Sequence, residues 1–199
     1  LKIRNESPYS FLLESVEGGE KIARYSFLGF NPFMLFEVRG DDYRIRALQK
    51  DIRFSDERIK GEKNPLNALK KIFSHYRTVP IPGLPRFSGG AVGYFGYEAV
   101  QLIEDIPSAS ADDLQLPDMI LMFFDTLLVF DYLQRKIFII VNSFLDGDGG
   151  ASSLLKSRYE NAVTRVATMR ELLRRPALTE LSSASSAGDL QYAIPRDDF

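Results

Sequence analysis

Two short runs of apolar and aromatic residues lie near the start of the chain. They cover residues 10–15 and 23–30, and the polar stretch Glu17-Gly18-Gly19-Glu20 separates them. Short apolar runs that are bounded by glycine and charged residues are typical of β-strands. This part of the sequence therefore predicts two strands joined by a loop.

A second pair of runs covers residues 33–38 and 43–48, on either side of Arg39-Gly40-Asp41-Asp42. In the later run arginine alternates with apolar residues, so that every second side chain can face water. The pattern predicts a hairpin with one solvent-exposed face. Residues 52–54 predict one further short strand.

Helical periodicity occurs in two places. Asn64 and Pro65 are an N-cap residue and a proline at the first helical position, and apolar residues follow at helical spacing as far as Tyr76. A longer amphipathic pattern extends from Leu154 to Leu173 and ends in basic residues, which suit the negative end of a helix dipole. Two amphipathic helices are predicted.

The longest apolar runs are residues 119–130 and 136–141. They predict a hairpin at the centre of the core, covered on both faces. Residues 87–98 carry a glycine at every third position from Gly90, which predicts a strand with a closely approaching neighbour and then a short helix over 97–103. Hairpins interleaved with helices indicate an α+β fold, with antiparallel sheets packed face to face and flanking helices.

The composition removes several classes of function. Among 199 residues, 25 Lys and Arg stand against 27 Asp and Glu, so the chain has no basic field for nucleic acid. The absence of cysteine excludes disulfides, zinc–thiolate sites and thiol catalysis. No apolar run approaches the ~20 residues of a membrane span. We therefore expect a cytoplasmic protein that binds neither nucleic acid nor membrane.

Few side chains remain for acid–base chemistry. The single histidine, His75, lies beside the apolar stripe of the first helix, where a solvated or rim position is expected. The carboxylates expected to be exposed or to cap turns are Glu17, Asp112, Asp113, Asp125 and Asp131. Glu14 differs because it stands in an apolar strand, beside Ser15 and before a glycine-rich loop. A carboxylate and a hydroxyl at that place could bind the amino group of a small ligand.

Three segments carry a family resemblance. They are Leu12-Leu13-Glu14-Ser15-Val16-Glu17-Gly18-Gly19-Glu20-Lys21 followed by Arg24-Tyr25-Ser26-Phe27-Leu28-Gly29, then Gly89-Gly90-Ala91-Val92-Gly93-Tyr94-Phe95-Gly96-Tyr97-Glu98, then Pro117-Asp118-Met119. In this order, over about residues 8–145, they resemble the amino-terminal region of anthranilate synthase component I, the large subunit of a chorismate-utilising enzyme.

The resemblance implies a lyase subunit of tryptophan biosynthesis that converts chorismate and ammonia to anthranilate and pyruvate with Mg²⁺. It implies a glutamine amidotransferase, component II, as the partner that supplies ammonia. It also implies feedback inhibition by L-tryptophan, an allosteric ligand bound largely by the Leu-Leu-Glu-Ser strand. On the matching positions, Leu13 is an apolar wall of this pocket, and Glu14 and Ser15 are polar contacts to the amino acid. Arg24 matches a basic position nearby.

In that family the chorismate site, the magnesium carboxylates and the rest of the tryptophan pocket come from the carboxy-terminal half, which has no counterpart in these residues. The resemblance thus implies no catalytic residue and no metal ligand in this chain. Residues 1–176 are expected to form the regulatory domain, and residues 177–199 a linker toward the absent catalytic domain. We expect the chain alone not to turn over chorismate.

Two alternatives remain open. Aminodeoxychorismate synthase component I, of the folate branch, shares the Gly-Gly-x-x-Gly-x-Phe-Gly-Tyr segment, although the uninterrupted stretch from Leu12 to Lys21 favours the tryptophan branch. The other alternative is a stand-alone small-molecule sensor. An open reading frame that stops at Phe199 would favour it.

Overall fold

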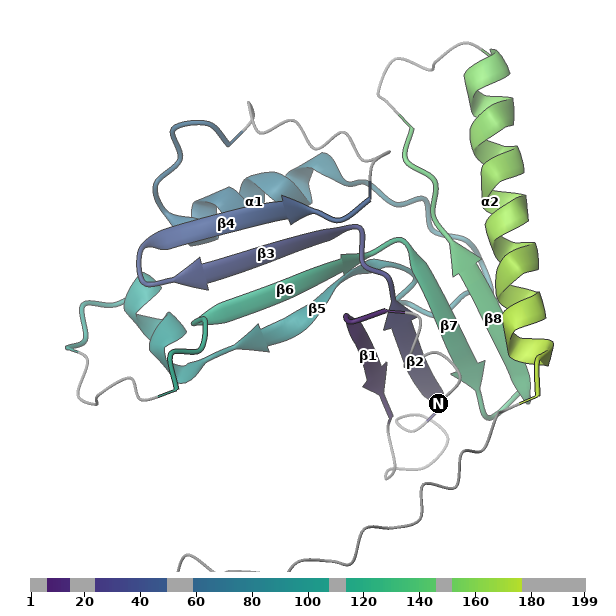
Figure 1. Cartoon of the computed structure of the whole chain (residues 1–199), viewed down its shortest axis with the longest axis horizontal. Helices are drawn as coiled ribbons and strands as arrows, with labels where there is room; N and C mark the ends of the chain where they lie inside the picture. The colour runs from purple at the N-terminus through teal and green to yellow at the C-terminus, as the bar shows by residue number, and fades with distance from the viewer. Residues whose placement is uncertain (1–6, 15–23, 50–58, 108–113, 146–151, 177–199) are drawn as a thin grey trace, which may run out of the picture.

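The computed structural model describes residues 7–14, 24–49, 59–107, 114–145 and 152–176. These residues form two four-stranded antiparallel sheets with helices against them (Figure 1). The predicted α+β class, with antiparallel sheets and flanking helices, is confirmed. The strand predicted at residues 52–54 and the linker predicted at residues 177–199 lie outside the described residues.

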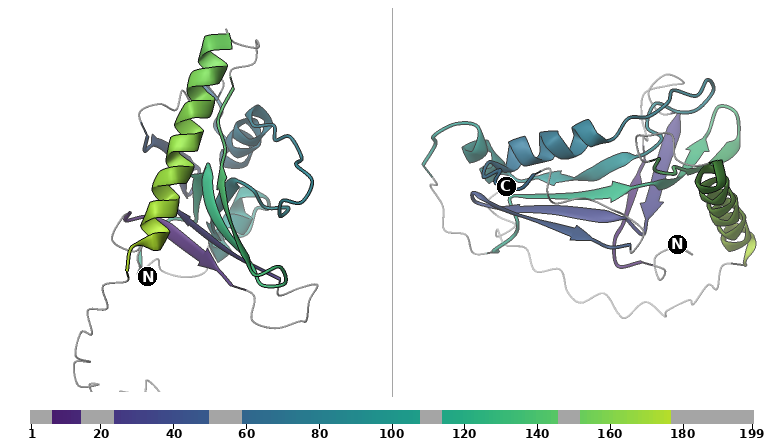
Figure 2. Two further views of the ribbon diagram at one scale, coloured as in Figure 1. Left: turned by 90° about the vertical axis from the view of Figure 1, so that its right-hand side faces the viewer. Right: turned by 90° about the horizontal axis from the view of Figure 1, so that it is seen from above.

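The first sheet has the strand order β1-β2-β7-β8. Its strands are β1 (Ser10–Leu13), β2 (Tyr25–Phe30), β7 (Thr126–Asp131) and β8 (Lys136–Val141). The helix α2 (Ser152–Arg174) lies along one face, which we call the outer face (Figure 2). The buried residues of this face are Leu28, Phe30 and Leu128, and α2 contacts them through Met169, Leu172 and Leu173.

The second sheet has the strand order β4-β3-β6-β5. Its strands are β3 (Met34–Arg39), β4 (Asp42–Ala47), β5 (Gly90–Phe95) and β6 (Met119–Phe124). The turn predicted between the third and fourth runs joins β3 to β4, with Arg39 opposite Asp42. One face of this sheet is covered by α1 (Pro65–His75).

The helix α1 begins as its sequence predicts. The side chain of Asn64 accepts hydrogen bonds from the backbone N–H groups of Leu66 and Asn67, at 2.9 and 3.1 Å. Pro65 occupies the first helical turn, where its missing N–H costs nothing. On the buried side of the helix, Ala68, Leu69 and Ile72 join one apolar cluster with Met34, Phe36, Val38, Met119, Leu121 and Phe123.

Two connections carry the chain directly from one sheet into the other. β2 leads into β3 through residues 31–33, and β6 leads into β7 through Asp125 alone. The sheets meet steeply at this corner, so the strands of one cross those of the other (Figure 1). An apolar cluster fills the angle between their inner faces. It contains Phe11, Leu127, Val129 and Ile140 of the first sheet and Phe124, Val92 and Met122 of the second.

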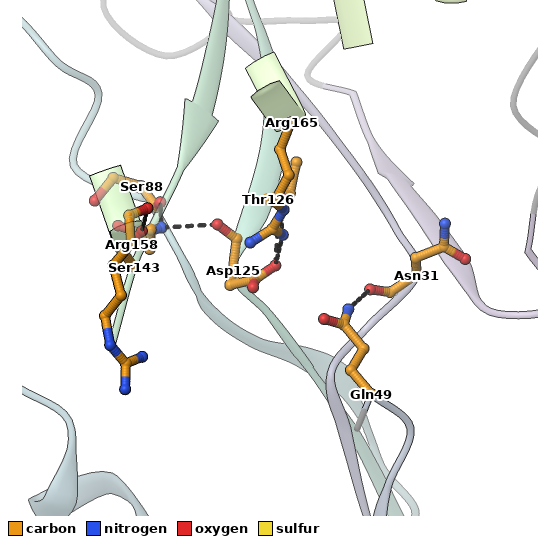
Figure 3. Close-up of polar contacts among 9 residues, drawn as sticks. Asn31, Gln49, Ser88, Asp125, Thr126, Ser143, Arg158 and Arg165 are labelled. Carbon is orange, nitrogen blue, oxygen red and sulfur yellow. Dashed lines mark hydrogen bonds and ion pairs between the residues drawn. The ribbon is translucent and has the colours of Figure 1, made fainter. Parts of the chain in front are cut away.

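The run at residues 119–130 is therefore two strands in different sheets, not one strand. Asp125 interrupts it and is buried, so the expectation that this carboxylate is exposed or caps a turn is wrong. Its Oδ1 atom accepts hydrogen bonds from Arg165 Nη2 at 2.6 Å and from the Thr126 hydroxyl at 3.1 Å (Figure 3). The backbone N–H of Asn142 donates to the Asp125 carbonyl oxygen at 2.7 Å. These bonds compensate for burying a charge and let the chain bend inside the core.

The elements after this corner are less buried than their patterns predict. The hairpin of β7 and β8 forms, with Thr126 opposite Val141, but β8 lies at the edge of the sheet and is only partly covered. No residue of α2 is buried, and the side chains of Leu155 and Tyr159 in its first half are exposed. The predicted coverage of both faces therefore holds for β7 and is wrong for β8.

Gly93→Ala should destabilise the second sheet. Gly93 stands opposite Leu121, and a Cβ atom there would overlap the carbonyl oxygen of Ile120 and lie 3.0 Å from the Cα atom of Leu121. Because backbone atoms occupy the space, the edge strand must shift, at a cost of about 1–3 kcal/mol. Urea denaturation followed by circular dichroism measures this loss.

The matched control is Gly40→Asn, in the turn between β3 and β4. No atom lies within 4 Å of a Cβ at this position, and its φ of 55° is one that asparagine adopts readily. The free energy of unfolding should change by less than about 1 kcal/mol. A Gly93→Ala variant as stable as this control would contradict the close approach of β5 and β6.

Candidate functional site

The strand that carries the predicted site forms one edge of the first sheet. β1 pairs with β2, and Leu13 stands opposite Phe27. Leu13 is 48% exposed, and Glu14, which follows it directly, is exposed as well. Ser15, the next predicted residue, lies outside the described residues. The structure thus places Leu13 and Glu14 together at an accessible sheet edge.

A row of aromatic rings lies on the inner face beside this edge. Residues directly opposite each other on antiparallel strands share a face, so Leu13 lies on the same face as Phe27. The ring centroids are 6.0 Å apart for Tyr25 and Phe27, 5.5 Å for Phe27 and Phe87, and 6.4 Å for Phe87 and Phe11. We call these four rings the aromatic row.

The sequence pattern alone does not point to the aromatic row. Phe27 follows Arg24 in a segment of the family resemblance, and its position opposite Leu13 depends on the register of β1 and β2. Phe87 reaches the row from the connection before β5, far along the chain from β2. Strand periodicity could have placed Tyr25 and Phe27 on one face, but no local signal points to Phe87.

Arg24 forms an ion pair with Asp131. Its Nη2 and Nε atoms donate to the carboxylate at 2.7 and 3.1 Å, and its guanidinium carbon lies 4.8 Å from the centre of the Tyr25 ring. The side chain of Asp131 is fully buried, whereas that of Arg24 is 28% exposed. Hydrogen bonding to Arg24 holds the pKa of Asp131 below its usual value, and the same hydrogen bond raises the pKa of Arg24.

The surrounding bonds attach the start of β2 to the end of β7. The Asp131 carboxylate accepts a hydrogen bond from the backbone N–H of Gln134 at 3.0 Å, and the Tyr132 N–H donates to the Arg24 carbonyl oxygen at 3.0 Å. The hydroxyls of Ser26 and Tyr132 lie 2.8 Å apart. Asp131 thus caps a turn, as the sequence predicts, and its side chain is buried there. Contact between Arg24 and a ligand stays a prediction.

The chemistry of this edge suits a ligand with two unlike ends. Leu13 offers an exposed apolar surface to a flat ring, and Glu14, the next residue, offers an exposed carboxylate to a cationic group. A separate hollow on the other sheet's helix is lined by Glu62, Asn67, Lys70, Lys71 and Ser74. None of the predicted site residues lines it, so β1 remains the candidate site.

In the described ranges no group of three or more His, Asp or Glu side chains comes together. In the same ranges no helix combines the length and the apolar character needed to span a bilayer. His75 is exposed on α1, as predicted.

Asp131→Asn should reduce the pH dependence of unfolding. Because the native pKa of Asp131 lies below its usual value, the ionised pair stabilises the fold above about pH 4, and this contribution is lost as the pH falls through the native pKa. The variant should be less stable than the parent at pH 7 and should lose less stability on acidification. Urea denaturation at steps between neutral and acidic pH measures both effects.

Asp42→Asn provides the matched control, because Asp42 is an exposed carboxylate on β4. This variant should keep the acid profile of the parent chain. If Asp131→Asn also keeps that profile, the ion pair with Arg24 does not couple protonation to folding.

Comparison with curated proteins gives one name repeatedly. The chain is 42% identical to "Anthranilate synthase component 1" of Acetivibrio thermocellus over 169 residues, which are 84% of this chain and 32% of that protein. It is 38% identical to the protein of that name in Synechocystis sp., covering 92% of this chain and 34% of the relative. For Pseudomonas putida the identity is 35%, over 98% of this chain and 38% of the relative. No family model matches the chain.

A solved structure agrees with the fold. Anthranilate synthase component I from Streptococcus pneumoniae TIGR4 superposes with a TM-score of 0.56 at 23% identity, covering 86% of this chain and 33% of that one. The chain spans about a third of the length of the curated relatives it matches. Its sequence and fold together make this chain a relative of anthranilate synthase component I, over about one third of that protein's length.

Proposed function

We propose that this chain is the amino-terminal, tryptophan-sensing part of an anthranilate synthase component I. The similarity to proteins of that name carries the proposal, because it extends over 84–98% of this chain and only 32–38% of theirs. The complete protein would be a cytoplasmic lyase that converts chorismate and ammonia to anthranilate and pyruvate. Its chorismate and Mg²⁺ sites would belong to the two thirds that have no counterpart here.

The sensor site is assigned to the edge strand β1. The indole of tryptophan would lie against Leu13 and the neighbouring rings of the aromatic row, and its ammonium group would be bound by Glu14. Ser15 would supply a hydroxyl to the amino acid. The accessible positions of Leu13, which lies opposite Phe27, and of Glu14, the next residue, support this assignment. A desolvated hydrogen bond of this kind contributes about 1–3 kcal/mol to discrimination between ligands.

Arg24 is assigned a positioning role in this site. Its guanidinium is bound to the buried carboxylate of Asp131 and stacks on Tyr25, which is a member of the aromatic row. Arg24 would therefore fix the start of β2, and with it the partner strand of β1. The family resemblance implies a basic position near the pocket, and this proposal gives that position a supporting role in place of a bond to tryptophan.

A partner subunit follows from the same proposal. The relatives are named component 1, which implies a second component. We assign that role to a glutamine amidotransferase, which would supply the ammonia that adds to chorismate.

This chain alone should not form anthranilate. With chorismate, an ammonium salt and Mg²⁺, the fluorescence of anthranilate should stay at background, whereas the full-length protein should produce it. Turnover by the 199-residue chain would contradict the assignment of catalysis to the remaining two thirds. Formation of 4-amino-4-deoxychorismate by the full-length protein would instead favour the folate-branch alternative.

Ser15→Ala and Ser15→Phe should relieve tryptophan inhibition of the full-length protein. Loss of one ligand hydrogen bond should raise the inhibition constant roughly 5- to 150-fold, while kcat and KM for chorismate stay close to the parent values. Steady-state assays across a tryptophan titration measure these constants. Phenylalanine should have the larger effect because its ring also occupies part of the pocket.

Ser10→Ala is the matched control, since Ser10 is an exposed serine at the other end of β1. Its inhibition constant should equal that of the parent. Unchanged inhibition in both Ser15 variants would rule out β1 as the sensor strand, whatever the product of the enzyme.

A further inference from the structure

The strand that carries the candidate site is attached to the core through one side chain. Among the four residues that the structure describes as β1, only Phe11 is buried. Leu12 and Leu13 are 40% and 48% exposed, and Ser10 is exposed as well. β1 also lies at an edge of its sheet, so it has a paired strand on one side only (Figure 1). The position of β1 therefore depends on its hydrogen bonds to β2 and on how Phe11 is held.

Gly29 provides the space in which the Phe11 ring lies. The two residues are directly opposite each other on β1 and β2. A Cβ atom on Gly29 would overlap the Cε1 atom of this ring and lie 2.9 and 3.0 Å from its Cδ1 and Cζ atoms. The ring thus occupies the place where a side chain of β2 would otherwise stand. A glycine inside a strand commonly marks a close approach of this kind.

Neighbouring rings hold Phe11 in that place. Its ring centroid lies 4.9 Å from that of Phe124, in an edge-to-face arrangement, and 6.4 Å from that of Phe87. Phe124 is itself buried, at the end of β6. In a close-packed core a ring held in this way cannot turn aside without moving its neighbours. A side chain at position 29 would therefore displace β1, because this strand is paired on one side only.

The start of β1 is held by separate bonds. Ser7 is buried, and its hydroxyl oxygen accepts hydrogen bonds from the backbone N–H groups of Asn31 and Tyr9, at 3.2 and 3.1 Å. The site lies beyond Phe11 in the other direction along the strand. At about 3.3 Å per residue, Leu13 stands about 7 Å past Phe11 and on the same face. A displacement at Phe11 therefore reaches the site over a short distance.

We propose that Phe11 and Gly29 are positioning residues for the sensor site, because their contact sets the place of β1. Leu13 and Glu14 can meet the ligand together only from that place. Phe11 is buried and Gly29 has no side chain, so their effect passes through the strand. The inference rests on the proposed function for the identity of the ligand, tryptophan. Gly29 is then a position at which sensitivity to tryptophan changes while the chemistry of the protein does not.

Gly29→Ala in the full-length protein tests this role. The added methyl group should displace β1 and raise the inhibition constant for tryptophan about tenfold or more, while kcat and KM for chorismate stay close to the parent values. Steady-state assays across a tryptophan titration measure all three constants. An inhibition constant equal to that of the parent overturns the proposal.

Gly93→Ala is the matched control, because it makes the same substitution in the second sheet, away from β1. A Cβ atom there would overlap the backbone of Ile120, so this variant also loses stability. Its inhibition constant should stay close to that of the parent. An equal rise in both variants reports a general loss of stability and overturns the positioning role.

Phe11→Leu in the Gly29→Ala background provides a rescue. Leucine lacks the Cε1 and Cζ atoms that the new methyl group would meet, so β1 should return toward its original place and the inhibition constant should fall again. The two substitutions should therefore be non-additive, which a double-mutant cycle of inhibition constants measures. Additive effects overturn the proposal.

Hydrogen exchange separates the positioning role from the proposed function. In the absence of tryptophan, Gly29→Ala should speed amide exchange several-fold in peptides that cover β1 and leave peptides from β3 at the parent rate. Unchanged exchange at β1 overturns the positioning role, even in a protein that tryptophan inhibits. Faster exchange at β1 in a protein that tryptophan does not inhibit rejects the proposed function and keeps Phe11 and Gly29 as the residues that position this strand.

Discussion

At Asp125 the chain leaves the second sheet and enters the first, and the placement of both sheets depends on how this residue is held. A buried carboxylate is costly unless it is paired and hydrogen-bonded. Arg165 and the Thr126 hydroxyl bind its side chain, and Asn142 binds its carbonyl oxygen. β7 therefore leaves the corner in a defined direction, and β2, β1 and β8 take their positions from it by pairing. The same ion pair fixes α2 on the outer face of that sheet.

A second buried carboxylate, Asp131, ends the same strand. Its partner is Arg24, which directly precedes β2. The two ion pairs thus hold opposite ends of β7, and each joins it to a different element, because Arg165 belongs to α2. β2 is fixed by its hydrogen bonds to β7 and by the pair at its start. The edge strand that carries Leu13 is then positioned by β2, which links the candidate site to the ends of β7.

The sequence predicts those elements that are fixed by interactions between residues close together in the chain. Asn64 caps α1 through two backbone N–H groups within three residues, and the turn after Arg39 closes a hairpin, so both follow from the sequence alone. The bend at Asp125 does not, because its partner Arg165 is 40 residues away and the surrounding run is apolar. The residues of the candidate site fall into the same two groups, those predicted from the sequence and those that only the fold brings together. Leu13 and Glu14 come from the family resemblance, whereas the Arg24–Asp131 pair, 107 residues apart, requires the register of the sheet.

Regulation in the proposed function needs two states that tryptophan binds with different affinity. A sheet held at both ends of β7 offers few such states, while β1 has four residues and pairs with β2 on one side. Tryptophan at β1 would therefore change the contact between this edge and the remaining polypeptide, without deforming the sheets.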